Sequence, residues 1–146
     1  MLRDSLTRLR AWLAPLQADR IESPEGVRAL AALARLCGQL QRYSEQIAAV
    51  REGLVSLDAI ARGRPIASEP GASGYHDARV AAERDLAARR EGGEPLADAF
   101  RQIAQPRNDI HHGGLNAQPL DAKALREQVE RLSARFVAQA AEARGE

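Results

Sequence analysis

The spacing of apolar residues constrains this chain most, because they recur every three or four positions along most of its 146 residues. The clearest run is Tyr43, Ile47, Val50, Leu54 and Leu57. That spacing places the side chains on one face of an α-helix and predicts a helix of about 20 residues that ends near residue 62. Val, Ile and Thr are scarce, whereas the good helix formers Ala, Leu, Arg, Glu and Gln dominate. We therefore predict an all-α protein.

Signals for helix starts and stops divide the chain further. Ser23 before Pro24 predicts an N-cap with proline in the first turn, and Asp121 predicts a second N-cap. Gly113 and Gly114 predict the end of a helix. Pro106 predicts a kink or a break, because the residue before a proline avoids the α conformation.

The predicted segments combine into one domain over residues 1–146. A leucine stripe predicts a first helix over residues 2–16. The sequence GRPIASEPGASG predicts a flexible loop over residues 63–74, and a charged helix is expected over residues 76–90. Further helices are expected from residue 24, from residue 95 and after residue 121. We expect an antiparallel bundle of five or six helices, and a second chain to pair with it wherever an apolar stripe stays exposed.

Composition excludes several classes of protein. Lys and Arg total 21 against 20 Asp and Glu, a net charge of +1, which argues against a polybasic nucleic-acid coat. The single cysteine, Cys37, excludes a disulfide framework or a multi-cysteine zinc site within the chain, and we expect it to be buried. No apolar run reaches about 20 residues, and the N-terminus lacks the continuous apolar region of a secretory signal. We predict a cytoplasmic bacterial protein with no membrane association.

The arginines of the predicted charged helix allow two interpretations. Arg79, Arg84, Arg89 and Arg90 could form a surface that follows RNA, or they could simply face solvent. Because acidic residues are interspersed among them, we favour the solvated surface.

The segment RNDIHHGG, residues 107–114, is the most informative for chemistry, and it holds two of the three histidines. On a helix, Asn108 and His112 share one face, and Arg107 and His111 share a neighbouring one. Arginine offers a fixed charged fork for phosphate oxygens, and histidine moves protons near neutral pH. Beside a glycine-opened backbone, this set could hold a phosphodiester. It suits RNA cleavage by the neighbouring 2′-hydroxyl, which needs no metal.

This segment resembles the signature of HEPN ribonuclease domains, Arg-x4-His with a polar residue after the arginine. The longer match, RNDIHHGGL followed by NAQPL, resembles the C-terminal effector domain of CRISPR-associated (CARF-HEPN) ancillary ribonucleases. In that register His112 corresponds to the catalytic histidine, Arg107 and Asn108 match the arginine and polar positions, and His111 falls on a variable position. Residues 36–57 are similar to an upstream helix pair, so the resemblance spans residues 27–136.

The resemblance implies a helical homodimer with one composite site that cleaves single-stranded RNA without metal or cofactor, in CRISPR or related antiviral defence. It implies Arg107, Asn108 and His112 as catalytic residues, and we keep His111 and Asp109 as secondary candidates. Many relatives also carry a sensor (CARF) domain that binds cyclic oligoadenylate. We find no such region here, so we expect a sensor or regulator outside this chain. We do not favour a metal site at His76, His111, His112 and Asp109, because adjacent histidines on a helix point about 100° apart.

Other interpretations of the function stay open. The chain could be a non-catalytic helical module that binds protein or RNA, or a HEPN-type toxin paired with a nucleotidyltransferase. A tetratricopeptide module needs a repeat of about 34 residues, and no second copy is present. For Asp109 we favour a salt bridge or a solvent-facing position over a role in proton transfer.

Overall fold

The computed structural model describes residues 7, 10–11, 13–64, 66, 74–89, 93–115 and 117–143. Within these ranges the chain is helical and has no strand, so the all-α prediction is confirmed. The elements are the 3₁₀ helix η1 (Ala14–Leu16) and the α-helices α2 (Pro24–Gln39), α3 (Tyr43–Ala61), α4 (Tyr75–Ala88), α5 (Pro95–His111) and α6 (Ala122–Glu142). None of these helices is long and apolar enough to cross a membrane.

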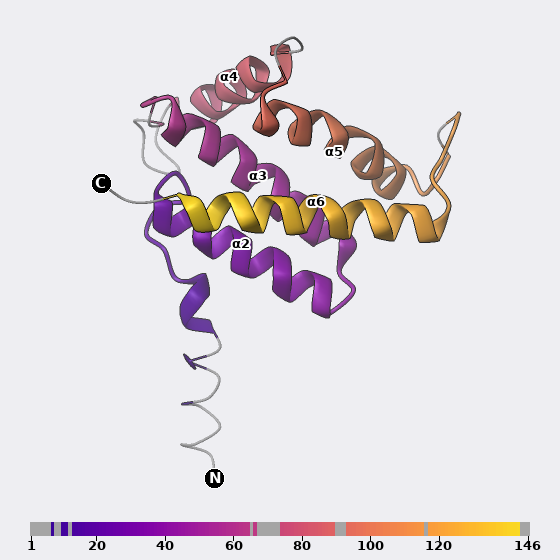
Figure 1. The fold of residues 1–146 in the computed structure, drawn as a ribbon, viewed down its shortest axis with the longest axis horizontal. Coiled ribbons are helices and arrows are strands. Elements are labelled where there is room, and N and C mark those ends of the chain that lie inside the picture. The colour runs from indigo at the N-terminus through magenta and orange to yellow at the C-terminus, as the bar shows by residue number, and fades with distance from the viewer. Residues whose placement is uncertain are drawn as a thin grey trace.

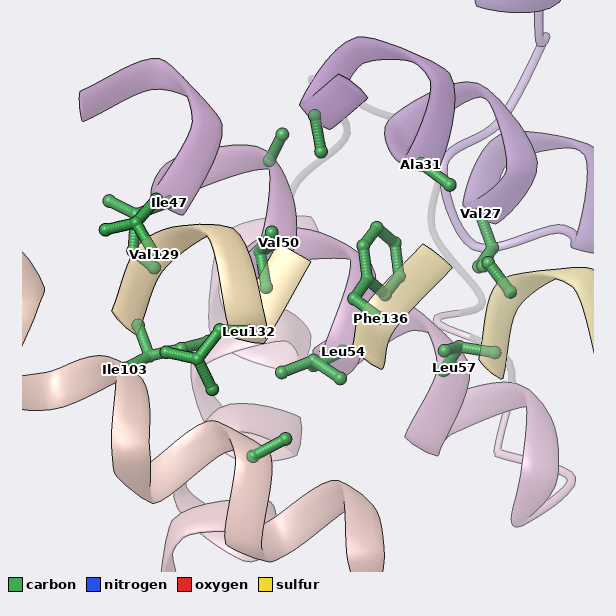
Figure 2. Packing of buried hydrophobic residues seen from close by; sticks show 14 residues of the cluster. Val27, Ala31, Ile47, Val50, Leu54, Leu57, Ile103, Val129, Leu132 and Phe136 are labelled. Carbon is green, nitrogen blue, oxygen red and sulfur yellow. The ribbon is translucent and has the colours of Figure 1, made fainter. Parts of the chain in front are cut away.

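Helix α3 lies at the centre of the molecule and contacts α2, α4, α5 and α6 (Figure 1). Its apolar stripe meets stripes from α2, α5 and α6 in the main core. Figure 2 shows Phe136 of α6 among Val50, Leu54 and Leu57 of α3. The predicted helix from Tyr43 is confirmed, since α3 ends at Ala61 with Arg62 as its C-cap.

Small residues allow the close approach of α3 and α6. A Cβ atom at Gly53 would lie 2.0 Å from Cζ of Phe136, so only glycine leaves room for the buried ring. Gly38 plays a similar part between α2 and α3, where a Cβ atom would lie 2.8 Å from Nε2 of Gln46. Cys37 beside it is buried, as expected.

The predicted helix termini are confirmed by their hydrogen bonds. Ser23 Oγ accepts from the backbone N–H of Gly26 at 3.0 Å, and Pro24 opens α2. Asp121 Oδ1 accepts from the N–H of Ala124 at 2.8 Å and caps α6. Helix α5 stops at His111, before Gly113 and Gly114 with φ of 58° and 77°.

Of the two alternatives predicted at Pro106, a kink or a break, the break is wrong. Helix α5 runs continuously from Pro95 to His111 with Pro106 buried inside it. A proline has no N–H, so the carbonyl four residues earlier, that of Gln102, loses its helical partner. Nε2 of Gln128 on α6 donates to that carbonyl at 3.1 Å and replaces the missing bond.

The interpretation of the α4 arginines as a solvated surface is wrong for two of them. The side chain of Arg79 is only 12% exposed and that of Arg89 16%, and both pair with carboxylates. Only Arg84 faces solvent among those that the structure describes, and Arg90 lies outside the described residues.

Two other predicted segments are described only in part. Most of the first helix, residues 2–16, lies outside the described residues; residues 7, 10, 11 and 13 are helical, and η1 follows. Residues 65 and 67–73 of the predicted loop over 63–74 are likewise outside, and residues 63, 64, 66 and 74 belong to no helix.

Candidate functional site

The predicted site residues lie at the C-terminal end of α5. Arg107, Asn108 and His111 occupy its last turns, and His112 is the C-cap. All four side chains are exposed. None of them takes part in a hydrogen bond or ion pair with another residue that the structure describes. Their side chains are therefore accessible to a ligand or to a second protein chain.

Asp109 differs from its neighbours, because it is buried and 4% exposed. Its Oδ2 accepts from the backbone N–H of Leu120 at 3.0 Å, just before α6 begins. Of the two positions favoured for Asp109, a salt bridge or a solvent-facing one, the solvent-facing position is therefore wrong. Its carboxylate holds the end of the α5–α6 loop, described over residues 112–115 and 117–121, against α5.

The glycine turn at the end of α5 closes on itself. Gly114 N–H donates to the carbonyl of Asp109 at 2.9 Å, Gly113 N–H to that of Ile110 at 3.4 Å, and Leu115 N–H to that of His112 at 3.0 Å. These N–H groups are used within the turn and are not available to a phosphate. An anion at this site would therefore have to be held without these three N–H groups.

Three hydrogen bonds fasten the second half of α5 to the chain that follows it, and we call them the α5–α6 seam. They are Gln128 Nε2 to Gln102 O (3.1 Å), Gln105 Nε2 to Gln118 O (3.4 Å) and Leu120 N to Asp109 Oδ2 (3.0 Å). Positions 102, 105 and 109 follow the three- and four-residue spacing of one helix face. The seam thus turns that face of α5 toward α6 and its preceding loop.

The sequence analysis missed this seam. Polar side chains bonded to distant backbone groups leave no periodic signal, and Gln128 is 26 residues from its partner. The one available hint was Pro106, because a proline inside a helix frees a carbonyl that needs another donor.

His76 is not part of the candidate site. It is exposed on the first turn of α4, which begins at the end of the molecule opposite the C-terminus of α5 (Figure 1). Over the described residues, no three His, Cys, Asp or Glu side chains gather as a group that could hold a metal ion.

A second polar cluster lies between α3 and α4, away from the candidate site. Arg79 donates to Glu22 Oε1 at 2.9 Å and to Glu52 Oε2 at 2.6 Å, and Tyr75 OH donates to Glu22 Oε1 at 2.5 Å. The side chain of Glu22 is 1% exposed. Burial, together with this bond to a carboxylate, raises the pKa of Tyr75. We call these four residues the α4 ion cluster.

The comparisons with known proteins find no matching family model, no similar curated protein and no similar solved structure. The functional argument therefore depends on the residues of the site.

Proposed function

We propose that this protein is a metal-independent endoribonuclease that cleaves single-stranded RNA with Arg107, Asn108 and His112. The observation that carries the proposal is the exposure of a guanidinium, an amide and two imidazoles on one helix end. None of these side-chain groups bonds to another residue that the structure describes. A charged group without a partner on a folded surface is available to bind a charged substrate. Buried Pro106 and Asp109 anchor the same turn of the helix, so these side chains project from a supported backbone.

The chemistry proposed is an internal transfer at phosphorus. The 2′-oxygen attacks the adjacent phosphate, the O2′–P bond forms and the P–O5′ bond breaks. The 2′-hydroxyl loses its proton and the departing 5′-oxygen gains one, which leaves a 2′,3′-cyclic phosphate and a 5′-hydroxyl. Arg107 binds the phosphate oxygens and stabilises the charge of the pentavalent transition state. His112 transfers a proton, and Asn108 orients the phosphate.

The proposal includes an antiparallel bundle that pairs as a homodimer. A single chain offers one Arg107 and one His112, whereas the cleavage requires both removal and delivery of a proton. Leu115, beside the site, is 90% exposed, and Leu40 in the turn between α2 and α3 is 60% exposed. Both turns lie toward the same end of the molecule (Figure 1). The exposed Leu115 next to the site favours a second copy that covers it.

The proposed setting is CRISPR-linked or related antiviral defence in the bacterial cytoplasm. There a sensor domain or regulator outside this chain would control cleavage. This part of the proposal comes from the resemblance of residues 107–120 to CARF-HEPN effectors.

The test is cleavage of single-stranded RNA at pH 7–8 in EDTA. We expect His112→Ala and Arg107→Ala to lower the rate by about 10²–10⁴-fold, the usual contribution of a positioned proton-transfer group. An all-deoxy strand of the same sequence should stay intact, because it lacks the 2′-hydroxyl.

Matched controls are available in the chain. His76 on α4 and Arg131 on α6 are exposed and lie outside the candidate site. His76→Ala and Arg131→Ala should therefore cleave at the wild-type rate. Equal rates in wild type and His112→Ala would reject the site assignment. A dimer that binds RNA but does not cut it would instead support the non-catalytic module.

A further inference from the structure

One buried residue holds both ends of the α5–α6 loop. The backbone carbonyl of Asp109 accepts from Gly114 N–H at 2.9 Å, near the start of the loop. Its side-chain Oδ2 accepts from Leu120 N–H at 3.0 Å, near the end. Asp109 therefore fixes the path of the loop at two points from a single position on α5.

The chemistry of an aspartate suits this position. A buried carboxylate is costly unless hydrogen bonds satisfy it, and a buried backbone N–H that donates to no acceptor is costly too. Leu120 directly precedes Asp121, the N-cap of α6, so the carboxylate also lies near the positive end of that helix. Both effects favour closing the loop onto α5.

The loop begins with the proposed catalytic histidine. His112 N–H donates to the carbonyl of Asn108 at 2.9 Å, and the carbonyl of His112 accepts from Leu115 N–H at 3.0 Å. The backbone of His112 thus belongs to the turn that Asp109 closes. If the turn opens, His112 loses its fixed place relative to Arg107.

We infer that Asp109 is a positioning residue that sets His112 relative to Arg107 and Asn108, through the α5–α6 loop. This inference rests on the ribonuclease function proposed above. Asp109 does not act on the substrate itself, because its side chain is buried and one of its oxygens is bound to the loop.

The experiment compares Asp109→Ala and Asp109→Asn in the full chain. Asparagine keeps an oxygen that can accept from Leu120, whereas alanine does not. We expect the alanine variant to speed hydrogen exchange at the Leu120 amide about tenfold or more. Its kcat should fall about 10- to 100-fold, the scale of an ångström-sized misplacement, while KM changes little. The asparagine variant should stay within about threefold of wild type in both readouts.

A matched control removes a comparable bond elsewhere. Ser23 Oγ accepts from a backbone N–H at the same distance of 3.0 Å, at the N-terminus of α2. Ser23→Ala should keep the wild-type kcat. If Asp109→Ala fails to fold, Gln128→Ala removes another bond of the α5–α6 seam from the surface and should lower kcat about threefold or more.

Three results would overturn the inference. One is an Asp109→Ala variant with wild-type kcat. Another is an unchanged rate of hydrogen exchange at the Leu120 amide in that variant. The third is an asparagine variant as slow as the alanine variant, which would show that the rate depends on the charge of the carboxylate and not on its hydrogen bond to Leu120.

The result for Asp109 can be separated from the result for the ribonuclease proposal. If the wild type does not cleave RNA, that proposal fails, and the backbone amide resonance of His112 still tests positioning. A shift in Asp109→Ala but not in Asp109→Asn supports the inference, and an unshifted resonance overturns it.

Discussion

Adjacent residues at the end of α5 have opposite surroundings. Asn108 is exposed, whereas Asp109 is buried and bonded to Leu120. One step along a helix rotates a side chain by about 100°, so it can move from solvent to the interior. At this scale, polarity alone does not distinguish a side chain that is open to a ligand from one that supports the backbone.

Tyr75 gives a prediction of how stability depends on pH. Burial and its bond to Glu22 raise the pKa of Tyr75 above its ordinary value, so the folded protein holds the phenolic proton more tightly than the unfolded chain does. This contribution is complete below the unfolded pKa of about 10 and is lost as pH rises through the folded pKa.

We expect Tyr75→Phe to be less stable than wild type by about 1 kcal/mol at pH 8. The difference should shrink as pH rises above about 10. Urea unfolding of both proteins from pH 8 to 11 measures it, and groups that titrate alike in both proteins cancel. A gap that stays constant over this range would contradict the prediction.

At the scale of elements, α3 and α6 approach each other through Gly53. In an exposed helix, changing glycine to alanine usually stabilises by about 0.5–1 kcal/mol. Here the new Cβ would meet the ring of Phe136 at 2.0 Å. We therefore expect Gly53→Ala to destabilise the protein by about 1–3 kcal/mol, the usual cost of an overpacked core.

The control for Gly53 is Ala48→Gly on the exposed side of the same helix, which should cost about 1 kcal/mol. Chemical unfolding of the two single variants measures whether each substitution raises or lowers the free energy of unfolding. In the Gly53→Ala background, Phe136→Leu should cost less than it does in wild type, because it removes the clash. A Gly53→Ala variant more stable than wild type would show that α3 and α6 pack less closely than described.

Across the whole molecule, two kinds of interface hold the helices together. Helices α2, α3, α5 and α6 share an apolar core, whereas α4 buries little apart from Leu86 and joins α3 largely through ion pairs. Some of the charged residues that nearly cancel in the whole chain are therefore paired between α3 and α4 and do not face solvent. The α4 ion cluster also connects the segment before α2 to α4.

Removal of Arg79 should therefore weaken the attachment of α4. Arg79→Met keeps much of the bulk but leaves the buried Glu22 without its cation and Glu52 with Arg51 alone, which should cost about 3–5 kcal/mol. Arg84→Ala, on the exposed side of the same helix, should change stability by less than about 0.5 kcal/mol. Thermal and urea unfolding of both variants provides the measurement. An equal loss of stability in Arg79→Met and Arg84→Ala would mean that the α4 ion cluster does not hold α4 against α3.

Local physics made much of this fold predictable. The helix over residues 43–61, the caps at Ser23 and Asp121 and the stop at Gly113 each depend on residues within about one turn of one another, so they can be recognised from adjacent letters. The composition of the candidate site was local too, since Arg107 and His112 lie on one short segment. The continuity of α5 through Pro106 was not predictable, because its substitute donor, Gln128, is on another helix.

Residue order alone established an all-α chain and its main helices, because helix formation and capping are decided by near neighbours, and it located the candidate site at residues 107–112. Tertiary packing determined which arginines are largely buried in ion pairs, that α5 continues through Pro106, and that the side chain of Asp109 is buried. Those outcomes depend on partners 11 to 57 positions away along the chain. Only the folded chain brings these partners within hydrogen-bond distance.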